Sequence, residues 1–133
     1  MKPILIAKAM FSVENHEKLV VITCEQHNLN SLLAPDLKNE FQKIIEQGQR
    51  NIALDVSAVK YCDSTGLSAI LVGNRLCRNA GGMFVLCGVK DMVEKLIKLS
   101  KLDTLLNIVP SPGEAIDVII MTEIEKEFDN DDV

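Results

Sequence analysis

Alternating and helically spaced apolar positions divide the chain into a succession of strands and helices. The β-branched run KLVVIT (18–23), with FSV (11–13) before it, predicts an N-terminal hairpin. NIALDV (51–56) alternates as strand residues do, and MFVLC (83–87) is a continuous apolar run, typical of a strand that is covered on both faces. LLNIV (105–109) predicts a further short strand.

Helical spacing marks the segments between these strands. Residues 30–48 carry apolar side chains three and four positions apart, with Pro35 tolerated in the first turn. A second helix is predicted from about residue 64 to 80, before two glycines, and a third in KDMVEKLIKL (90–99). The motif SPGE (111–114) is a capping box with proline at the first helical position, so a last helix begins there.

Strands that alternate with helices predict an α/β domain whose sheet is partly parallel. The 133 residues fit one compact domain, and we expect a single layer of helices because the helices are few. The stretch EIEKEFDNDDV (123–133) is acidic and is expected to be solvated. We therefore place the domain at residues 1–128 and a frayed acidic tail at 129–133.

Composition and charge narrow the function. Apolar residues make up 47% of the chain, which is enough for a packed core. The net charge of −5 disfavours direct nucleic-acid binding, because an acidic domain gains nothing from neutralising phosphates. Membrane insertion is disfavoured because no stretch approaches the about 20 apolar residues that cross a bilayer, and MKPILIAKAM (1–10) is too brief for a signal peptide.

The cysteines disfavour a metal site. The chain has four of them in apolar stretches, none in a C-x-x-C pair, and only His16 and His27 could join them as ligands. They are Cys24, Cys62, Cys77 and Cys87. Such cysteines behave as small buried hydrophobes and suit a reducing cytoplasm. We therefore expect no metal, no cofactor and a cytoplasmic location.

The stretch YCDSTGLSAIL (61–71) places Ser64 where a strand ends and a helix begins. A hydrolase elbow reads G-x-S-x-G, which this stretch does not match, and both histidines lie far upstream without an obvious orienting carboxylate. The glycine spacings of phosphate-binding loops are missing as well. Two hypotheses remain for this position: a helix cap by Asp63 or Ser64, worth about 1 kcal/mol, or a serine that another protein modifies.

A helical wheel divides the helix that begins at Ser64 into two arcs. The core arc holds Ala69, Ile70, Val72, Gly73, Leu76, Cys77 and Ala80, and the solvent arc holds Ser68, Asn74, Arg75, Arg78 and Asn79. Leu67 and Leu71 also fall on the solvent arc, below Ser64. Exposed apolar residues with a polar rim indicate a protein contact, but packing under a neighbouring loop explains the two leucines equally well.

Phosphorylation of Ser64 would add about −1.5 to −2 charges beside those leucines. The free N–H groups and the dipole of the helix N-terminus favour an anion, whereas Asp63 repels it. The fold would therefore survive the modification while an apolar docking surface is spoiled, which is the behaviour of a binary switch.

These residues carry a family resemblance. NIALDVSAVKYCDSTGLSAILVGNRLCRNAGGMFVLCGV (51–89), followed by LIKLSKLDTLLNI (96–108), resembles the STAS domains of bacterial anti-sigma factor antagonists. The family signature is an apolar strand, D-S-[ST]-G-[LI], a helix, one or two glycines and a second apolar strand, and all of these occur here in order. LNSLLAPDLKNEF (29–41) also looks like the first helix of the family, so the similarity covers nearly the whole chain.

The resemblance implies a STAS-like single domain with a mixed sheet of about four strands and about four helices. It implies that the chain is not an enzyme, and that Ser64 is phosphorylated by a partner that is both an anti-sigma factor and a GHKL-type serine kinase. The unphosphorylated antagonist would bind this partner and release a sigma factor, and a PP2C-type phosphatase would restore the serine. The residues expected to contact the partner are Asn30, Ser31, Asp63, Thr65, Gly66, Leu67, Ser68, Leu71 and Arg75.

The chain departs from the family before the first helix. The family often has G-x-[LI]-D there, and this chain has His27 at the glycine and Asn30 at the aspartate, so a charge is missing. Two other functions stay open for the same fold. One is a STAS subunit of a lipid or solute ABC transporter complex, and the other is a small-ligand sensor, for which the sequence displays no convergent polar pocket.

Overall fold

The computed structural model describes residues 10–131, so the expectation that residues 1–10 are not a signal peptide falls, except for Met10, outside the described part of the chain. The strands are β1 (Phe11–Asn15), β2 (Val20–Cys24), β3 (Asn28–Leu29), β4 (Ile52–Asp55), β5 (Tyr61–Cys62), β6 (Phe84–Cys87) and β7 (Asn107–Val109). The helices are α2 (Ala34–Glu46), α3 (Ser64–Asn79), α4 (Asp91–Leu99) and α5 (Pro112–Asp131). Each predicted strand and helix is therefore confirmed, and β3 and β5 are additional.

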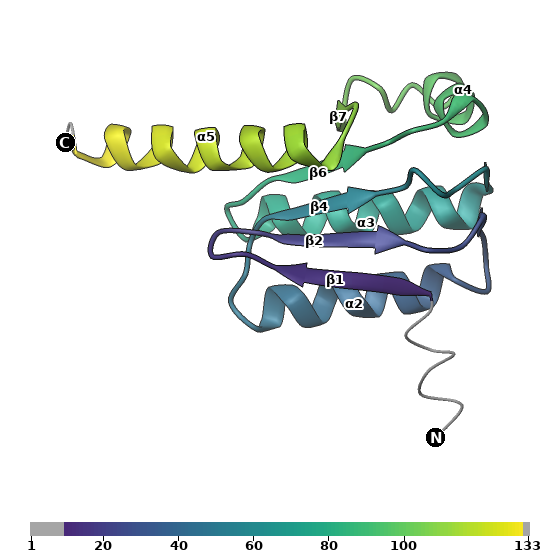
Figure 1. Ribbon diagram of the computed structural model, residues 1–133, viewed down its shortest axis with the longest axis horizontal. Helices are drawn as coiled ribbons and strands as arrows, with labels where there is room; N and C mark the ends of the chain where they lie inside the picture. Colours follow the sequence, from purple (N-terminus) through teal and green to yellow (C-terminus); the bar gives the residue numbers. More distant parts are fainter. Residues whose placement is uncertain (1–9, 132–133) are drawn as a thin grey trace.

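A mixed sheet of five strands organises the domain, in the order β1-β2-β4-β6-β7 (Figure 1). The predicted hairpin is confirmed as the antiparallel pair β1 and β2, with Phe11 opposite Cys24 and Asn15 opposite Val20. The other neighbours are parallel, as the strand–helix alternation predicted. The small strands β3 and β5 form a separate parallel pair in which Leu29 lies opposite Cys62. The α/β fold class is confirmed, and the main sheet has five strands where about four were expected.

Helices cover both faces of the sheet, so the expectation of a single helical layer is wrong. Helices α2 and α3 pack against the face that carries the larger apolar side chains, around Phe41 and Phe84, whose rings meet edge to face at 5.6 Å. Helix α5 covers the other face, where Ala115 and Ile119 join a cluster with Ala53 and Val85. In NIALDV, the apolar alternation marks the face covered by α2 and α3 and assigns only Ala53 to the face covered by α5. The pattern therefore did not indicate that a helix packs against the second face.

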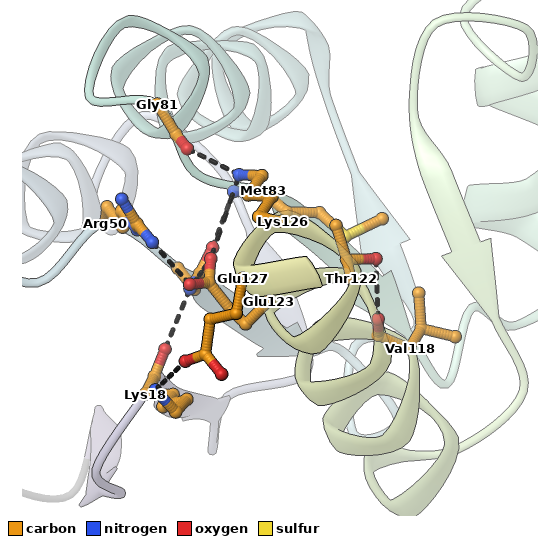
Figure 2. A network of polar contacts seen from close by, with 10 residues as sticks. Lys18, Arg50, Gly81, Met83, Val118, Thr122, Glu123, Lys126 and Glu127 are labelled. Atoms are coloured by element: carbon orange, nitrogen blue, oxygen red, sulfur yellow. Dashed lines mark hydrogen bonds and ion pairs between the residues drawn. The ribbon is translucent and has the colours of Figure 1, made fainter. Parts of the chain in front are cut away.

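Helix α5 is held to the strand ends by a polar cluster, the α5 clamp (Figure 2). The Asn51 amide donates to the Lys18 carbonyl oxygen at 2.8 Å and to the Glu123 carboxylate at 3.0 Å, and it accepts from the Met83 nitrogen at 2.8 Å. Arg50 forms an ion pair with Glu123, which is 5% exposed. The expectation that the stretch from residue 123 onward is solvated is therefore wrong at Glu123.

The rest of α5 adds two outer contacts to this clamp. Lys126 donates to the Gly81 carbonyl oxygen at 2.7 Å, and Glu127 lies 3.3 Å from the Lys18 ammonium. Because the helix continues to Asp131, residues 129–131 extend it, and the proposed division at residue 128 stays a prediction. None of the helices within residues 10–131 is long and apolar enough to cross a membrane.

Candidate functional site: the start of helix α3

The first turn of α3 is closed by Asp63. The Oδ1 atom of Asp63 accepts from the Gly66 nitrogen at 3.0 Å and from the Thr65 hydroxyl at 2.6 Å, and its backbone is extended as an N-cap requires. The hydrogen bond from Thr65, followed by the one from Gly66, holds the pKa of Asp63 below its usual value. Of the two capping hypotheses, Asp63 is the cap and Ser64 is not.

Ser64 is the first residue of α3 and is exposed. Its hydroxyl makes no hydrogen bond to any residue of the described range 10–131. The fold therefore does not use this oxygen, which belongs to an exposed residue at the end of a helix where unpaired N–H groups are concentrated.

The first turn of α3 needs a glycine at position 66 because other atoms approach this backbone closely. A Cβ atom at this position would collide with the carbonyl oxygen of Leu29 and would lie 2.9 Å from the sulfur of Cys62. The β3–β5 pair is the reason for the close approach, since it brings Leu29 beside Cys62 and lets the Asp63 nitrogen donate to the Leu29 carbonyl at 3.3 Å. This pairing places the loop before α2 next to the start of α3.

Asn30 lies on that neighbouring loop and has a local structural role. Its side-chain Oδ1 accepts from the Leu32 nitrogen at 3.0 Å, and its carbonyl oxygen accepts from the nitrogens of Leu33 and Ala34. Asn30 therefore shapes the entry into α2 without a charge. The side chain of His27 bonds to the Ala58 carbonyl at 3.1 Å, which fits a loop residue.

The leucines predicted as a docking surface are largely internal. Leu67 is 7% exposed and belongs to the main core cluster, and Leu71 is half-buried and packs against that cluster. That cluster draws on distant parts of the chain, since Leu106 belongs to it and Leu102 packs against it. The expectation that Leu67 is exposed is wrong, and its burial favours packing over a protein contact for this residue.

The remaining predicted contact residues divide by exposure. Ser31, Asp63, Thr65, Ser68 and Arg75 are exposed, Asn30 is half-buried and Gly66 is buried. The wheel was also wrong at Asn74, which is 4% exposed, and at Ala80, which is exposed. The core arc is otherwise confirmed, with Ala69, Ile70, Gly73 and Cys77 buried and Val72 and Leu76 half-buried.

Sequence reasoning missed three exposed apolar side chains near this end of the sheet. Leu32 is 80% exposed on the loop that Asn30 shapes, and Tyr61, two residues before the cap, is 58% exposed. Met92, at the start of α4, is 56% exposed and lines a shallow groove of about 240 Å³ together with Tyr61. No periodic pattern marks them, because all three stand in loops or at element ends. We call these three residues the apolar rim.

The thiol nearest to this site is poorly suited to chemistry. Burial, and then the negative charge of Asp63, raises the pKa of Cys62 to about 12. The other three cysteines are buried, and burial is the main reason why the pKa of each is also raised to about 12. A thiolate nucleophile is therefore disfavoured here.

The chain is similar in sequence to known proteins. The model of the STAS domain family matches residues 10–115. Among curated proteins, the chain is similar to the "Putative anti-sigma factor antagonist BtrV" of Bordetella bronchiseptica, with 31% identity over 81 residues, which are 61% of this chain and 70% of that protein.

Solved structures share the fold. A "putative anti-sigma factor antagonist" from Thermotoga maritima matches with a TM-score of 0.74 at 26% identity, over 83% of this chain and 94% of that one. The Bacillus cell fate determinant SpoIIAA in its phosphorylated form matches with a TM-score of 0.66 at 22% identity, over 82% of this chain and 98% of that one. At this lower identity the likeness concerns the fold alone.

Proposed function

This chain belongs to the STAS domain family, in its anti-sigma factor antagonist branch, and from that premise we propose that it binds an anti-sigma factor only while Ser64 is unphosphorylated. The observation that carries the proposal is the state of the Ser64 hydroxyl. It is exposed at the first position of α3 and makes no hydrogen bond within residues 10–131, because Asp63 caps the helix in its place. A serine that the fold does not need is free to be modified.

A phosphate at Ser64 would change the surface more than the fold. It adds about −1.5 to −2 charges at a helix N-terminus, where N–H groups and the dipole favour anions. The neighbouring Asp63 carboxylate opposes it, and its lowered pKa keeps it ionised at neutral pH. The domain therefore stays folded while this end of α3 becomes strongly negative.

The docking surface in this proposal differs from the pair of leucines that the wheel indicated. We assign it to the exposed polar residues around Ser64, namely Ser31, Thr65 and Ser68, together with the apolar rim of Leu32, Tyr61 and Met92. Exposed apolar side chains with a polar surround are typical of a protein contact. A phosphate within this surface would leave an uncompensated charge at the interface, which is costly.

In this proposal the chain is a substrate and not a catalyst. The anti-sigma factor would be the GHKL-type kinase that transfers phosphate to Ser64, and a PP2C-type phosphatase would remove it. The setting would be cytoplasmic, where the four free thiols are stable.

The test uses purified native protein and three variants in pull-downs of the kinase, with intact mass measured before and after ATP is added. Ser64→Ala should capture the kinase and gain no phosphate, and Ser64→Glu should bind weakly while remaining folded. Ser100→Ala is the matched control, an exposed serine outside the assigned surface, and should gain one phosphate as the native chain does.

Two results would overturn the proposal. One is phosphate on Ser64→Ala at the native level, which would place the modified residue elsewhere. The other is co-purification with an ABC transporter ATPase in place of a kinase, which would favour the transporter-subunit function.

A further inference from the structure

The polar side of α3 borders a groove of about 480 Å³, apart from the start of the helix. Five of its lining residues come from α3 and one from the segment after α4: Leu71, Asn74, Arg75, Arg78, Asn79 and Leu105. Between Ser64 and Arg75 the helix rises about 16 Å, at about 1.5 Å per residue. The groove is therefore separate from the proposed phosphorylation site.

Asn74 is the residue that this groove sets apart. Its side chain is 4% exposed, yet its amide makes no hydrogen bond to any other residue within 10–131. None of its polar atoms is sealed from solvent, and the residue lines the groove. Water in the groove can bond to this amide, but no hydrogen bond within the fold requires it, and an apolar side chain would pack against the core as well. The fold alone therefore gives no reason for an asparagine here.

Arg75 and Arg78 add two positive charges on the same side of the helix. They are two of the three arginines in a chain of net charge −5, and neither forms an ion pair with a described residue. The third, Arg50, is paired with Glu123. Two cations three positions apart repel each other, and an anion held between them removes that cost.

The donors in the groove define the ligand chemistry. Guanidinium groups bind carboxylate and phosphate oxygens in a forked geometry, and the amides of Asn74 and Asn79 offer N–H donors. Leu71 is half-buried and Leu105 is 46% exposed, so part of the border of the groove is apolar. We propose that this groove binds a small anion in which a carboxylate or phosphate group is joined to a short apolar portion.

This inference does not rest on Ser64 or on the proposed function. It favours the small-ligand sensor that stayed open for this fold. The sequence displayed no convergent polar pocket, but in the structure the polar side chains of α3 line one groove. Asn74 and Leu105 were not among the residues expected to act. Arg75 was assigned to the partner surface, and here it has a second use.

The test is a titration of the full-length protein followed by ¹⁵N–¹H correlation spectra at constant ionic strength, with sodium chloride as the balancing salt. The probes are N-acetylleucine, a carboxylate with an apolar side chain, and inorganic phosphate. We expect saturable shifts of the Asn74 side-chain NH₂ signals and of the backbone amide signals of residues 74–79, with a Kd on the order of millimolar, typical of so few ligand atoms. The tighter probe identifies the anion class.

Three variants separate binding from folding. The double change Arg75→Ala and Arg78→Ala should raise the Kd by about tenfold or more, because charge-assisted hydrogen bonds are lost. Asn74→Leu should raise it similarly while the melting temperature stays the same or rises, because no internal hydrogen bond is lost. The double change Lys43→Ala and Lys95→Ala is the charge-matched control outside the groove, and should change the Kd by less than about twofold.

Three results would overturn the inference. The first is the absence of saturable Asn74 shifts with both probes. The second is unchanged binding in the double arginine variant, which would mean that the anions bind elsewhere. The third is a clear fall in melting temperature for Asn74→Leu, which would mean that the amide serves the fold.

Discussion

The Oδ1 atom of Asp63 lies 3.0 Å from the backbone nitrogen of Gly66, and this hydrogen bond caps α3. Capping by the residue before Ser64 leaves the serine hydroxyl without a structural role. Asp63 thus maintains the helix, and the adjacent Ser64 is available for regulation.

This division predicts unequal stability effects at two adjacent positions. Asp63→Ala should lower the free energy of unfolding by about 1 kcal/mol, because the cap is lost. Ser64→Ala should change it by less than about 0.5 kcal/mol, because no hydrogen bond is lost. Urea unfolding followed by circular dichroism measures both. Equal losses at the two positions would mean that Ser64 shares in the cap.

Gly66→Ala should be among the most damaging small substitutions in the domain. The new methyl group would meet the Leu29 carbonyl oxygen, and backbone cannot move aside as a flexible side chain can. We expect a loss of about 2 kcal/mol or more in the free energy of unfolding. Gly113→Ala is the control: only Ser111 Oγ approaches, at 4.0 Å, and a neutral or slightly stabilising effect is expected there. Similar results for both glycines would show that close packing is not the reason for Gly66.

The α5 clamp predicts a pH-dependent contribution from Glu123. Burial raises the pKa of this carboxyl, but hydrogen bonds from Arg50 and Asn51 outweigh that effect and hold the pKa below its usual value of 4.5. A carboxyl whose pKa is lowered by folding stabilises the protein above its unfolded-state pKa, and the contribution is lost as the pH falls through the lower folded-state value.

Glu123→Gln should therefore lower the free energy of unfolding by about 1–3 kcal/mol at pH 7, the range for hydrogen bonds to charged groups. The difference from the native protein should shrink as the pH falls below about 4. Glu125→Gln, an exposed change on the same helix, should have little effect at either pH. A difference for Glu123→Gln that stays constant from pH 7 to pH 3 would contradict the ionised clamp.

The four cysteines should resist alkylation in the folded protein. With each pKa raised to about 12 from an ordinary 9.0, the thiolate fraction at pH 8 falls by about a thousandfold. Brief treatment with iodoacetamide should leave the native mass unchanged, and the same treatment in guanidinium should modify all four thiols. Rapid modification of Cys62 in the native state, the half-buried one, would show that its environment is more open.

Local pattern predicted most of the secondary structure but not what covers it. The wheel of α3 placed Ile70 and Cys77 correctly, because those positions follow from the 3.6-residue period alone. It was wrong at Leu67 and Asn74, which are buried although the 3.6-residue period assigns them to the solvent arc. Helical spacing contains no information about which distant segments cover a helix.

The candidate site shows the same limit. The motif around Ser64 could be recognised in the sequence because helix capping and close approach of backbone segments require particular residue types at fixed offsets. The apolar rim could not be recognised in this way, because the β3–β5 pairing brings together the segments that carry Leu32 and Tyr61, and two-residue strands have no detectable period. The arginine groove likewise needs Leu105 from outside the helix.

The hydrogen bond between Asn51 and Glu123 joins positions 72 residues apart, and this distance has a consequence for synthesis. As the ribosome delivers the chain from its N-terminus, β2, β4 and β6 emerge well before α5 exists. Until then, one side of the nascent sheet has nothing over Ala53 and Val85. The nascent chain would therefore bind chaperones most readily before the last helix docks, and a translational pause shortly before Glu123 would prolong this interval.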